Sequence, residues 1–350
     1  MSLKQLYFKA YVLRKLIKKE IKSKVDIPFG QKIRMWRNGF FSASYVLYDL
    51  GKNNPKDYLS DYQENVNAVR LNKESAYLLD NKLKFYDMIK DDLCIPQDIG
   101  FLKDGKINAI DSKDAISISE LADILSKGET LILKPVDDAS GRGVVKVYKK
   151  GDTIFYNLEE ISIEEFLKRV SVLDNYIISF FIKQAEYSAR IYPKAVNTVR
   201  ILTMISPKTG RPFIATAAHR FATDKSFPVD NCNAGGLTAN IDIESGKLSK
   251  AVSPYFKGNS LKWYENHPDS GEPIKDIVVP RWEEIKTSIL SKAGKLPQLK
   301  YIGWDIVVTD DGFIVLEGND GPDIKLHQVH SPLLANPDVK SIFQFYGVVK

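Results

Sequence analysis

The sequence has little cysteine and little histidine, the side chains that build most disulfide scaffolds and zinc sites. Its 350 residues include two cysteines, Cys94 and Cys232, which lie far apart in the chain and form no CxxC pair. A disulfide scaffold and a cysteine-rich zinc site are therefore excluded. With four histidines in the chain, a histidine-rich metal site is not expected either. Any chemistry must rest on carboxylates, amides, lysines and arginines.

Long apolar runs are also missing. No stretch approaches the ~18–20 apolar residues that a membrane-spanning helix needs, and the first residues lack the apolar core of a secretory signal. We therefore expect a cytoplasmic protein. Hydrophobic residues make up 44% of the chain and charged residues 27%. This composition is typical of a globular protein and excludes a mostly disordered, fibrous or coiled-coil chain.

The excess of positive charge is confined to one end of the chain. The net charge is +6, but residues 1–50 alone carry eleven Lys/Arg and three Asp/Glu. These residues therefore have a charge of +8 and the rest of the chain a charge of −2. Because the basic charge belongs to an N-terminal arm, no nucleic-acid partner is expected.

The arm itself has a helical pattern. Apolar residues recur at roughly helical spacing across residues 3–24 and lysines fill much of the remainder, which predicts one helix. Such a helix could attach to an anionic membrane surface, giving a peripheral contact at the inner membrane face. The alternative is a solvated helix packed on the body of the protein. We favour the alternative, because runs of charge are usually solvated faces.

The spacing of strands and turns predicts the fold class. Strand-like segments joined by turn residues dominate the second half of the chain, with helices between them. The predicted hairpins pair 198–206 with 212–222, 237–243 with 247–252, and 301–309 with 313–318, and helices are predicted at 74–90, 117–126, 161–170 and 279–293. Hairpins imply antiparallel sheets, so we predict an α+β fold rather than a doubly wound parallel sheet.

Two carboxylates are predicted to meet in the last hairpin. With a regular register, Val307 lies opposite Val315 and Asp305 lies opposite Glu317, with their Cβ atoms ~4.5–5.5 Å apart. Asn319 follows Glu317 by two residues and shares its face of the strand. Like charges that face each other are destabilising, and hard oxygen ligands suit Mg²⁺. The hairpin therefore predicts a magnesium site, or else a charged sheet rim whose carboxylates are solvated.

A lysine and a glycine-rich loop indicate a phosphate site. Lys134 interrupts the apolar strand 131–135, and a lysine in a buried strand needs an anionic partner. The segment 137–144 then supplies glycines and a serine whose backbone N–H groups can surround phosphate oxygens. It lacks the ending of a Walker A motif, and a strand rather than a helix follows it, unlike a dinucleotide fingerprint. The alternative is an ordinary flexible hairpin loop.

The order of these motifs resembles the ATP-grasp superfamily, and more closely its branch associated with sugar transfer and polysaccharide biosynthesis. The motifs are Asn81-Lys82, Leu133-Lys134-Pro135, Ser140-Gly141-Arg142-Gly143-Val144, Asn197-Thr198-Val199-Arg200, Asn233-Ala234-Gly235-Gly236, Gly303-Trp304-Asp305 and Glu317-Gly318-Asn319. The resemblance implies two antiparallel-sheet lobes that grip ATP, preceded by a helical arm. The expected divisions are 1–80 (arm and preceding region), 81–182 (small lobe with the glycine-rich lid) and 183–350 (lobe with the metal and substrate site).

The resemblance also implies roles for individual residues. Lys82 and Lys134 resemble the two lysines that hold the ATP phosphates, and Arg200 resembles the arginine near the γ-phosphate and the acyl phosphate. The lid over the phosphates corresponds to Ser140, Gly141, Arg142, Gly143 and Val144. The metal ligands correspond to Asp305, Glu317 and Asn319, which would hold two Mg²⁺ ions bridged by Glu317.

The adenine site departs from the family pattern. The segment 176–182 resembles the inter-lobe strand whose backbone binds adenine, which implicates Phe180, Phe181 and Ile182. Many relatives carry Gln or Glu where this chain has Ser179 and Phe180, so Gln184 or Lys183 is expected to substitute for that side chain.

The implied activity is an ADP-forming ligation of a carboxylate to an amine through an acyl phosphate. Arg200 can bind a carboxylate or acyl phosphate in a bidentate fork, and acceptor recognition is expected from Arg220, Asn233, Gly235 and Gly236. The expected substrates are a small or sugar-linked carboxylate, such as a uronic acid, and an amine or amino acid. A kinase on the same fold and a non-catalytic nucleotide-binding scaffold remain as alternatives.

Overall fold

The computed structural model describes residues 3–110, 116–137, 141–256 and 258–350. Its helices are α1 (Leu3–Lys22), α2 (Phe29–Arg37), α3 (Ser42–Leu47), α4 (Tyr77–Asp80), α5 (Lys82–Ile89), α6 (Glu120–Ser126), α7 (Ile163–Ser171), α8 (Glu186–Ile191), α9 (Trp282–Gly294), α10 (Lys325–Gln328) and α11 (Pro337–Phe345). Within the described ranges, no helix has both the length and the apolar character needed to cross a membrane.

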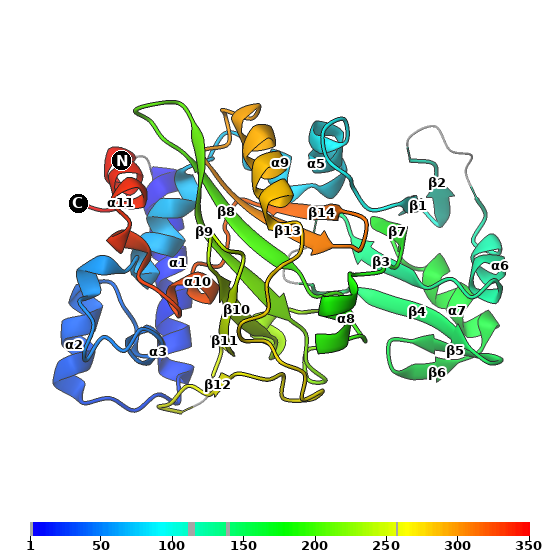
Figure 1. The fold of residues 1–350 in the computed structure, drawn as a ribbon, viewed down its shortest axis with the longest axis horizontal. Coiled ribbons are helices and arrows are strands. Elements are labelled where there is room, and N and C mark those ends of the chain that lie inside the picture. Colours follow the sequence, from blue (N-terminus) through cyan, green and yellow to red (C-terminus); the bar gives the residue numbers. More distant parts are fainter. Residues whose placement is uncertain (1–2, 111–115, 138–140, 257) are drawn as a thin grey trace.

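The strands form two antiparallel sheets, the first at one end of the molecule and the second in its middle, with α2, α3 and α11 at the other end (Figure 1). The first sheet has the order β2-β1-β7-β3-β4-β5-β6, formed by β1 (Asp98–Lys103), β2 (Lys106–Asn108), β3 (Leu131–Pro135), β4 (Val145–Lys150), β5 (Thr153–Tyr156), β6 (Glu159–Ile161) and β7 (Tyr176–Phe180). The second has the order β12-β11-β10-β9-β8-β13-β14, formed by β8 (Val199–Ile205), β9 (Pro212–Phe221), β10 (Leu237–Ile241), β11 (Leu248–Val252), β12 (Trp263–Tyr264), β13 (Tyr301–Val308) and β14 (Phe313–Asn319). The predicted fold class, α+β with two antiparallel sheets and an N-terminal helical region, is confirmed.

The first sheet is half-buried in the expected alternation. Leu131 and Leu133 of β3 are buried on the face that packs on α6 and α7. Ile132 and Lys134 alternate with them and therefore point to the opposite face. This opposite face looks toward the second sheet and carries Lys134 into the space between them.

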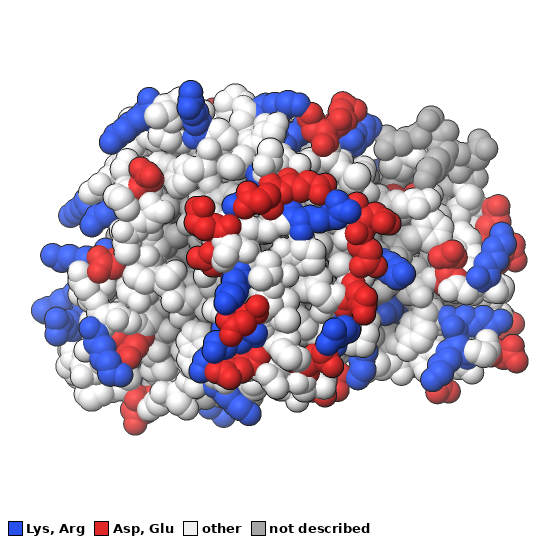
Figure 2. Space-filling view, in the orientation of Figure 1, with Lys and Arg blue, Asp and Glu red and all other residues white. Residues whose placement is uncertain are grey.

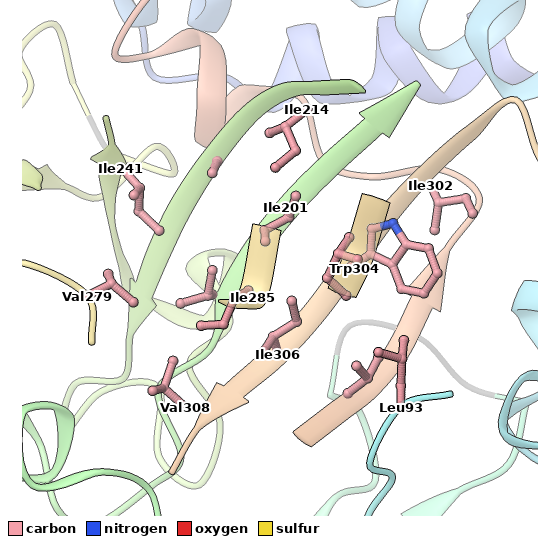
Figure 3. Close-up of a cluster of buried hydrophobic side chains, with 14 of the residues drawn as sticks. Leu93, Ile201, Ile214, Ile241, Val279, Ile285, Ile302, Trp304, Ile306 and Val308 are labelled. Atoms are coloured by element: carbon pink, nitrogen blue, oxygen red, sulfur yellow. The ribbon is translucent and has the colours of Figure 1, made fainter. Parts of the chain in front are cut away.

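The second sheet is covered on both faces, since its central strands β8 and β13 are buried along their whole length. On one face Ile201, Trp304 and Ile306 pack with Ile285 and Ile289 of α9, and Figure 3 shows part of this cluster. On the other face a second cluster joins the strands to α11 and the region before α4; it contains Leu202, Met204, Tyr301, Val339 and Phe343. Where this second apolar face ends, polar side chains begin.

The last hairpin is less regular than the sequence suggested. Val307 pairs with Ile314, and Val315 pairs with Ile306, so the predicted Val307–Val315 pairing is wrong. The register shifts by one residue between Ile306 and Asp305, where a β-bulge places Leu316 between the paired positions. Beyond the bulge, Asp305 does lie opposite Glu317.

The predicted divisions of the chain do not follow the two sheets in every part. The predicted small lobe begins at residue 81, yet α5 packs on β14 of the second sheet. Phe85 of α5 contacts Trp304, with ring centroids 5.9 Å apart. The divisions after residues 80 and 182 stay predictions.

Candidate active site

A row of charged residues crosses the second sheet where its apolar face ends. Arg200 on β8 pairs directly with Asp305 on β13, and Asp305 pairs directly with Glu317 on β14. Directly paired residues share a face of the sheet. On β9, Ala218 is the partner of Arg200, and Arg220 lies two residues further on the same face. Four strands thus bring an acid pair and two arginines together.

The arginines hold the inner carboxylate. Arg200 donates to both oxygens of Asp305, through Nε and through Nη2 at 2.8 Å, and Arg220 donates to Asp305 Oδ2 at 3.0 Å. The side chains of Arg200 and Asp305 are 5% and 2% exposed. Burial alone would raise the pKa of Asp305, but the two guanidinium groups outweigh it and lower this pKa to about 2. Asp305 is therefore an anion at neutral pH.

The outer carboxylate is in a different environment. Glu317 is 30% exposed, and its closest described cation, Lys82 Nζ, lies 3.9 Å from Oε2. Burial, reinforced by the neighbouring Asp305 and opposed by Lys82, raises the pKa of Glu317. Asn319, two residues along, donates from Nδ2 to the backbone oxygen of Gly303 at 3.2 Å. Its amide oxygen is the end of the side chain that can act as a ligand.

Lys134 reaches the same place from the first sheet. Its Nζ donates to Tyr86 Oη at 2.7 Å, and Tyr86 in turn donates to the backbone oxygen of Leu316 at 2.9 Å. Burial lowers the pKa of Lys134, an effect that Asp98 opposes. Lys134 thus contacts the phenol of Tyr86 and has carboxylates nearby. It forms no direct ion pair with another described residue.

Lys82 is placed by the N-terminus of α5. Asn81 caps this helix by accepting from the backbone N–H of Lys84 at 3.1 Å. The Asn81 amide also donates to Asp137 at 2.7 Å, and Asp137 follows directly after β3 and its neighbour Val136. This link holds the backbone near Lys82 close to the backbone near Lys134, although about fifty residues separate the two lysines in the sequence.

The described part of the glycine-rich loop lies against the loop after β9 and against β7. Gly141 and Gly143 have φ angles of +69° and +71°, which L side chains rarely adopt. A Cβ on Gly141 would lie 3.0 Å from Val229 Cγ1, and one on Gly143 would lie 2.8 Å from Tyr176 Oη. The loop therefore needs glycine for both conformation and space. Ser140, which we predicted to bind phosphate, lies outside the described residues.

A cavity of about 280 Å³ joins these groups. Most of the predicted site residues line it: Lys82, Lys134, Gly141, Arg142, Val144, Phe180, Phe181, Ile182, Arg200, Arg220, Asn233, Asp305, Glu317 and Asn319. Gly143, Gly235, Gly236 and Gln184 are not among the lining residues. The structure thus brings both lysines, both arginines and the carboxylate pair to one place, while the role of each remains a prediction.

Gln184 has a local structural role. Its amide nitrogen donates to the backbone oxygens of Tyr192 and Ala195, and its amide oxygen accepts from Ser188 and from the backbone of Asn197. All four bonds tie together the segment between β7 and β8. The expected contact of Gln184 with adenine would require it to leave this buried network.

Ser179 and Phe180, where this chain departs from the family pattern, also make contacts within the protein. Ser179 donates from Oγ to Asp98 at 2.6 Å, and both side chains are buried. Phe180 packs on the core of the first sheet. The ring of Phe181 lies under Lys146, whose Nζ is 4.0 Å from the ring centroid.

A further carboxylate, which was not among the predicted site residues, holds Arg220. Asp230 accepts from Thr198, through its backbone at 2.8 Å and its hydroxyl at 2.5 Å, and forms an ion pair of 3.0 Å with Arg220. Asp230, Thr198 and Asp323 all line the cavity. Asp230 precedes the Asn233-Ala234-Gly235-Gly236 motif by three residues, so proximity to a motif was the available signal.

The carboxylate pair suits a magnesium ion by its chemistry. Asp305, Glu317 and Asn319 offer oxygen atoms, the ligands that Mg²⁺ prefers. Burial and the neighbouring Asp305 raise the pKa of Glu317, and a cation would stabilise the second charge of this acid pair. Among the described residues, no group of three or more His, Cys, Asp or Glu side chains is arranged to hold a metal. A metal here would therefore be bound by two carboxylates and an amide.

Comparison with known proteins decides the family. The model of the sugar-transfer associated ATP-grasp family matches residues 60–341. This chain belongs to that family. The resemblance identified from the short motifs is thereby confirmed, and the family match extends over both sheets and the charged row. None of the curated proteins compared with this member of the family matches it.

Solved structures similar to this family member include ATP-grasp ligases. The ATP-grasp ligase PsnB, complexed with a phosphomimetic variant of a minimal precursor, Mg and ADP, is 13% identical (TM-score 0.38; 77% of this chain and 61% of that chain covered). D-alanine–D-alanine ligase from Bacillus anthracis is 15% identical (TM-score 0.40; 82% and 78% covered). The purK N5-carboxyaminoimidazole ribonucleotide synthetase is 12% identical (TM-score 0.40; 75% and 53% covered). This chain thus spans less than two thirds of the PsnB and purK chains.

Proposed function

We propose that this protein is an ATP- and Mg²⁺-dependent ligase that joins a carboxylate to an amine. The observation that carries the proposal is the single cavity that collects Lys82, Lys134, Arg200, Arg220 and the pair formed by Asp305 with its neighbour on β14. Such a set of charges suits a triphosphate and a second anion side by side. The family provides independent support for the use of ATP.

Each group has a proposed part. Lys82 and Lys134 bind the phosphates, and Glu317, Asp305 and Asn319 hold magnesium, which would neutralise charge on the transferring phosphoryl group. Arg220 lies at the rim of the buried pair, at 14% exposure, and is the arginine more accessible to a substrate carboxylate. Arg200 positions Asp305 through its two hydrogen bonds.

The proposed reaction has two steps. A carboxylate oxygen of the substrate attacks the γ-phosphorus of ATP, the bond to the β-phosphate oxygen breaks, and ADP leaves. The amine nitrogen then attacks the carbonyl carbon of the acyl phosphate, losing a proton, and inorganic phosphate leaves. Neither step needs a nucleophile from the protein, consistent with a cavity lined mainly by cations, carboxylates and apolar side chains. The glycine loop would keep water from the acyl phosphate.

The proposed carboxylate is sugar-linked, such as a uronic acid in a cell-surface polysaccharide pathway. The family description, which associates these proteins with sugar transfer, supports it. The amine would enter beside Asp230, Asn233 and Asp323, which line the cavity near Arg220.

Product analysis tests the reaction type. The protein is incubated with ATP, Mg²⁺, a panel of uronic acids and hydroxylamine, which traps an acyl phosphate as a hydroxamate. A ligase gives hydroxamate together with ADP and phosphate. A kinase gives ADP and a stable phosphorylated product without hydroxamate, and a non-catalytic scaffold gives neither. Either of the last two results would overturn the ligase.

Nucleotide binding is tested separately by thermal unfolding with ATP, with Mg²⁺ and with both. Ligand at ~100 times its dissociation constant adds ~2.7 kcal/mol to stability. We expect a Mg²⁺-dependent shift that Lys134→Ala abolishes and that Lys150→Ala, at the exposed end of β4, retains. No shift in the unsubstituted protein at millimolar ATP would refute the nucleotide site itself.

A further inference from the structure

The N-terminal helix α1 has three distinct faces. One face packs on the body through the buried Leu16, and Glu20 beside it accepts from the backbone N–H of Ser42 at 2.9 Å and from Trp36 Nε1 at 3.2 Å. The helix is therefore fixed to the protein rather than projecting from it. The alternative that we favoured from the sequence, a helix packed on the body, agrees with this face but leaves the other two unexplained.

The second face is apolar and exposed. Leu6, Leu13, Ile17 and Ile21 recur at intervals of four or seven residues and so form one stripe along the helix. Their side chains are between 41% and 77% exposed. The stripe spans fifteen residue steps, about 22 Å at ~1.5 Å per residue. An apolar stripe of this length on the surface of a folded protein marks an interaction site.

The third face is basic. Arg14, Lys15, Lys18 and Lys22 follow the stripe along the same helix. The helix contains a single acidic residue, Glu20, and its carboxylate is engaged by the residues of the packed face. No negative charge therefore interrupts the basic face within the part of α1 that the structure describes.

The neighbouring helix α2 extends both properties. Phe29 and Trp36 are exposed, and their rings meet edge to face with centroids 6.5 Å apart. The hydrogen bond from Trp36 to Glu20 places this aromatic pair beside α1. Arg34 and Arg37 are exposed on the same helix. In Figure 2, Lys and Arg side chains, with some Asp and Glu among them, lie along the edge of the molecule where Figure 1 places α2.

We propose that the exposed face of α1 and α2 docks onto a membrane surface that contains anionic lipids. An apolar stripe beside lysines and arginines, with an exposed tryptophan at its border, matches the boundary between lipid headgroups and acyl chains. The positive charge of this face favours a membrane over a protein partner. Each lysine close to an anionic leaflet adds to the attraction, whereas a protein partner would need an acidic surface of its own. This inference is independent of the proposed ligase activity.

Vesicle flotation of the full chain tests the proposal. We expect binding to vesicles of equimolar phosphatidylcholine and phosphatidylglycerol, and at least about tenfold weaker binding to phosphatidylcholine alone, because each basic residue near the surface contributes about a fivefold factor. High salt should weaken the binding, since it screens exposed charges. Equal binding to both vesicles, or no binding to either, would overturn the proposal.

Two double variants separate the apolar and basic contributions. Ile17→Ser with Ile21→Ser, and Lys18→Glu with Lys22→Glu, should each weaken binding about tenfold or more. The matched controls, Leu158→Ser with Val172→Ser and Lys150→Glu with Lys208→Glu, alter exposed residues outside the arm and should bind as the unsubstituted protein does. All four keep the melting temperature, because the altered side chains are exposed. Arm variants that bind normally would refute the proposed surface.

Light scattering without lipid tests the main alternative to a membrane, which is self-association of the chain. If a second copy of the chain covered the stripe, the unsubstituted protein would be a dimer and the Ile17→Ser, Ile21→Ser variant a monomer. That result would overturn the membrane proposal in favour of self-association. A monomer in both cases, together with lipid binding that the arm variants lose, would support it.

Discussion

Loss of charge should destabilise the fold at Asp305 and have little effect on stability at Glu317. Asp305→Asn leaves Arg200 and Arg220 without their shared anion in a site where Arg200 is 5% exposed. The pKa of Asp305, about 2 against an ordinary 3.8, corresponds to a preference for the charged form of about 2 kcal/mol. Breaking a buried pair typically costs ~3–5 kcal/mol. Because asparagine can still accept one hydrogen bond, we expect a loss of about 2–4 kcal/mol.

Glu317→Gln should behave differently. Burial and the neighbouring Asp305 raise the pKa of Glu317, so the folded protein already disfavours its charge. A neutral glutamine keeps the shape and removes the repulsion, and the free energy of unfolding should stay within about 0.5 kcal/mol or rise slightly. Both variants should lose Mg²⁺-dependent turnover, because each removes an anionic metal ligand.

Urea unfolding without nucleotide, in the presence of a chelator, measures both changes. Asp311→Asn, at the exposed tip of the same hairpin, is the control for the chemical change and should be near neutral. Equal free energies for Asp305→Asn and Glu317→Gln would refute the assignment of the inner acid to the arginines. Turnover that survives Glu317→Gln would refute the metal site.

Two further predictions concern stability. Gly318→Ala places a Cβ 2.5 Å from Phe85 Cε2 and 2.8 Å from Leu79 Cδ2, so thermal unfolding should show that the protein loses about 1–3 kcal/mol of stability. The control Gly312→Ala, whose Cβ has nothing within 4 Å, should be near neutral. Equal melting temperatures for the two variants would contradict this packing. For Glu64, burial, reinforced by Asp323 and Asp61 and opposed by Lys325, raises the pKa to about 8. The folded state therefore keeps a proton that the unfolded chain releases near its ordinary value of 4.5, and stability should fall as the pH rises between these two values. Glu64→Gln should flatten this decline in urea unfolding measured across that range, and an unchanged slope would contradict the assignment.

Local patterns in the sequence were enough for the hairpins and for the acid pair, but the predicted helix 74–90 is divided at Asn81 into α4 and α5. Alternation and turn residues predicted the hairpins, and Asp305 was placed opposite Glu317 correctly. The supporting pairing of Val307 with Val315 was wrong, because a bulge has no signature in a run of apolar residues such as 313–316. The prediction that the acids meet on one face was right, because beyond the bulge the strands pair in the register that a regular hairpin would have had.

Contacts that depend on the whole fold were beyond sequence reasoning. Nothing near Asp230 in the sequence shows that it pairs with Arg220 and Thr198, since these bonds form only when the loop after β9 folds back on the sheet. Gln184 matched an expected role by position alone, whereas its bonds to Tyr192 and Ala195 arise from an irregular turn. Periodicity carries no information about such turns.

The bulge at Leu316 separates the tip of the hairpin from its functional end. Between Val308 and Phe313 the strands pair in one register, and at Asp305 they pair in another. A turn altered by one residue in length could therefore be absorbed by loss or gain of the bulge, with the acid pair still facing each other. The tip is thus a position where related chains can vary in length, and where an inserted label or affinity tag should leave the geometry of the acid pair intact.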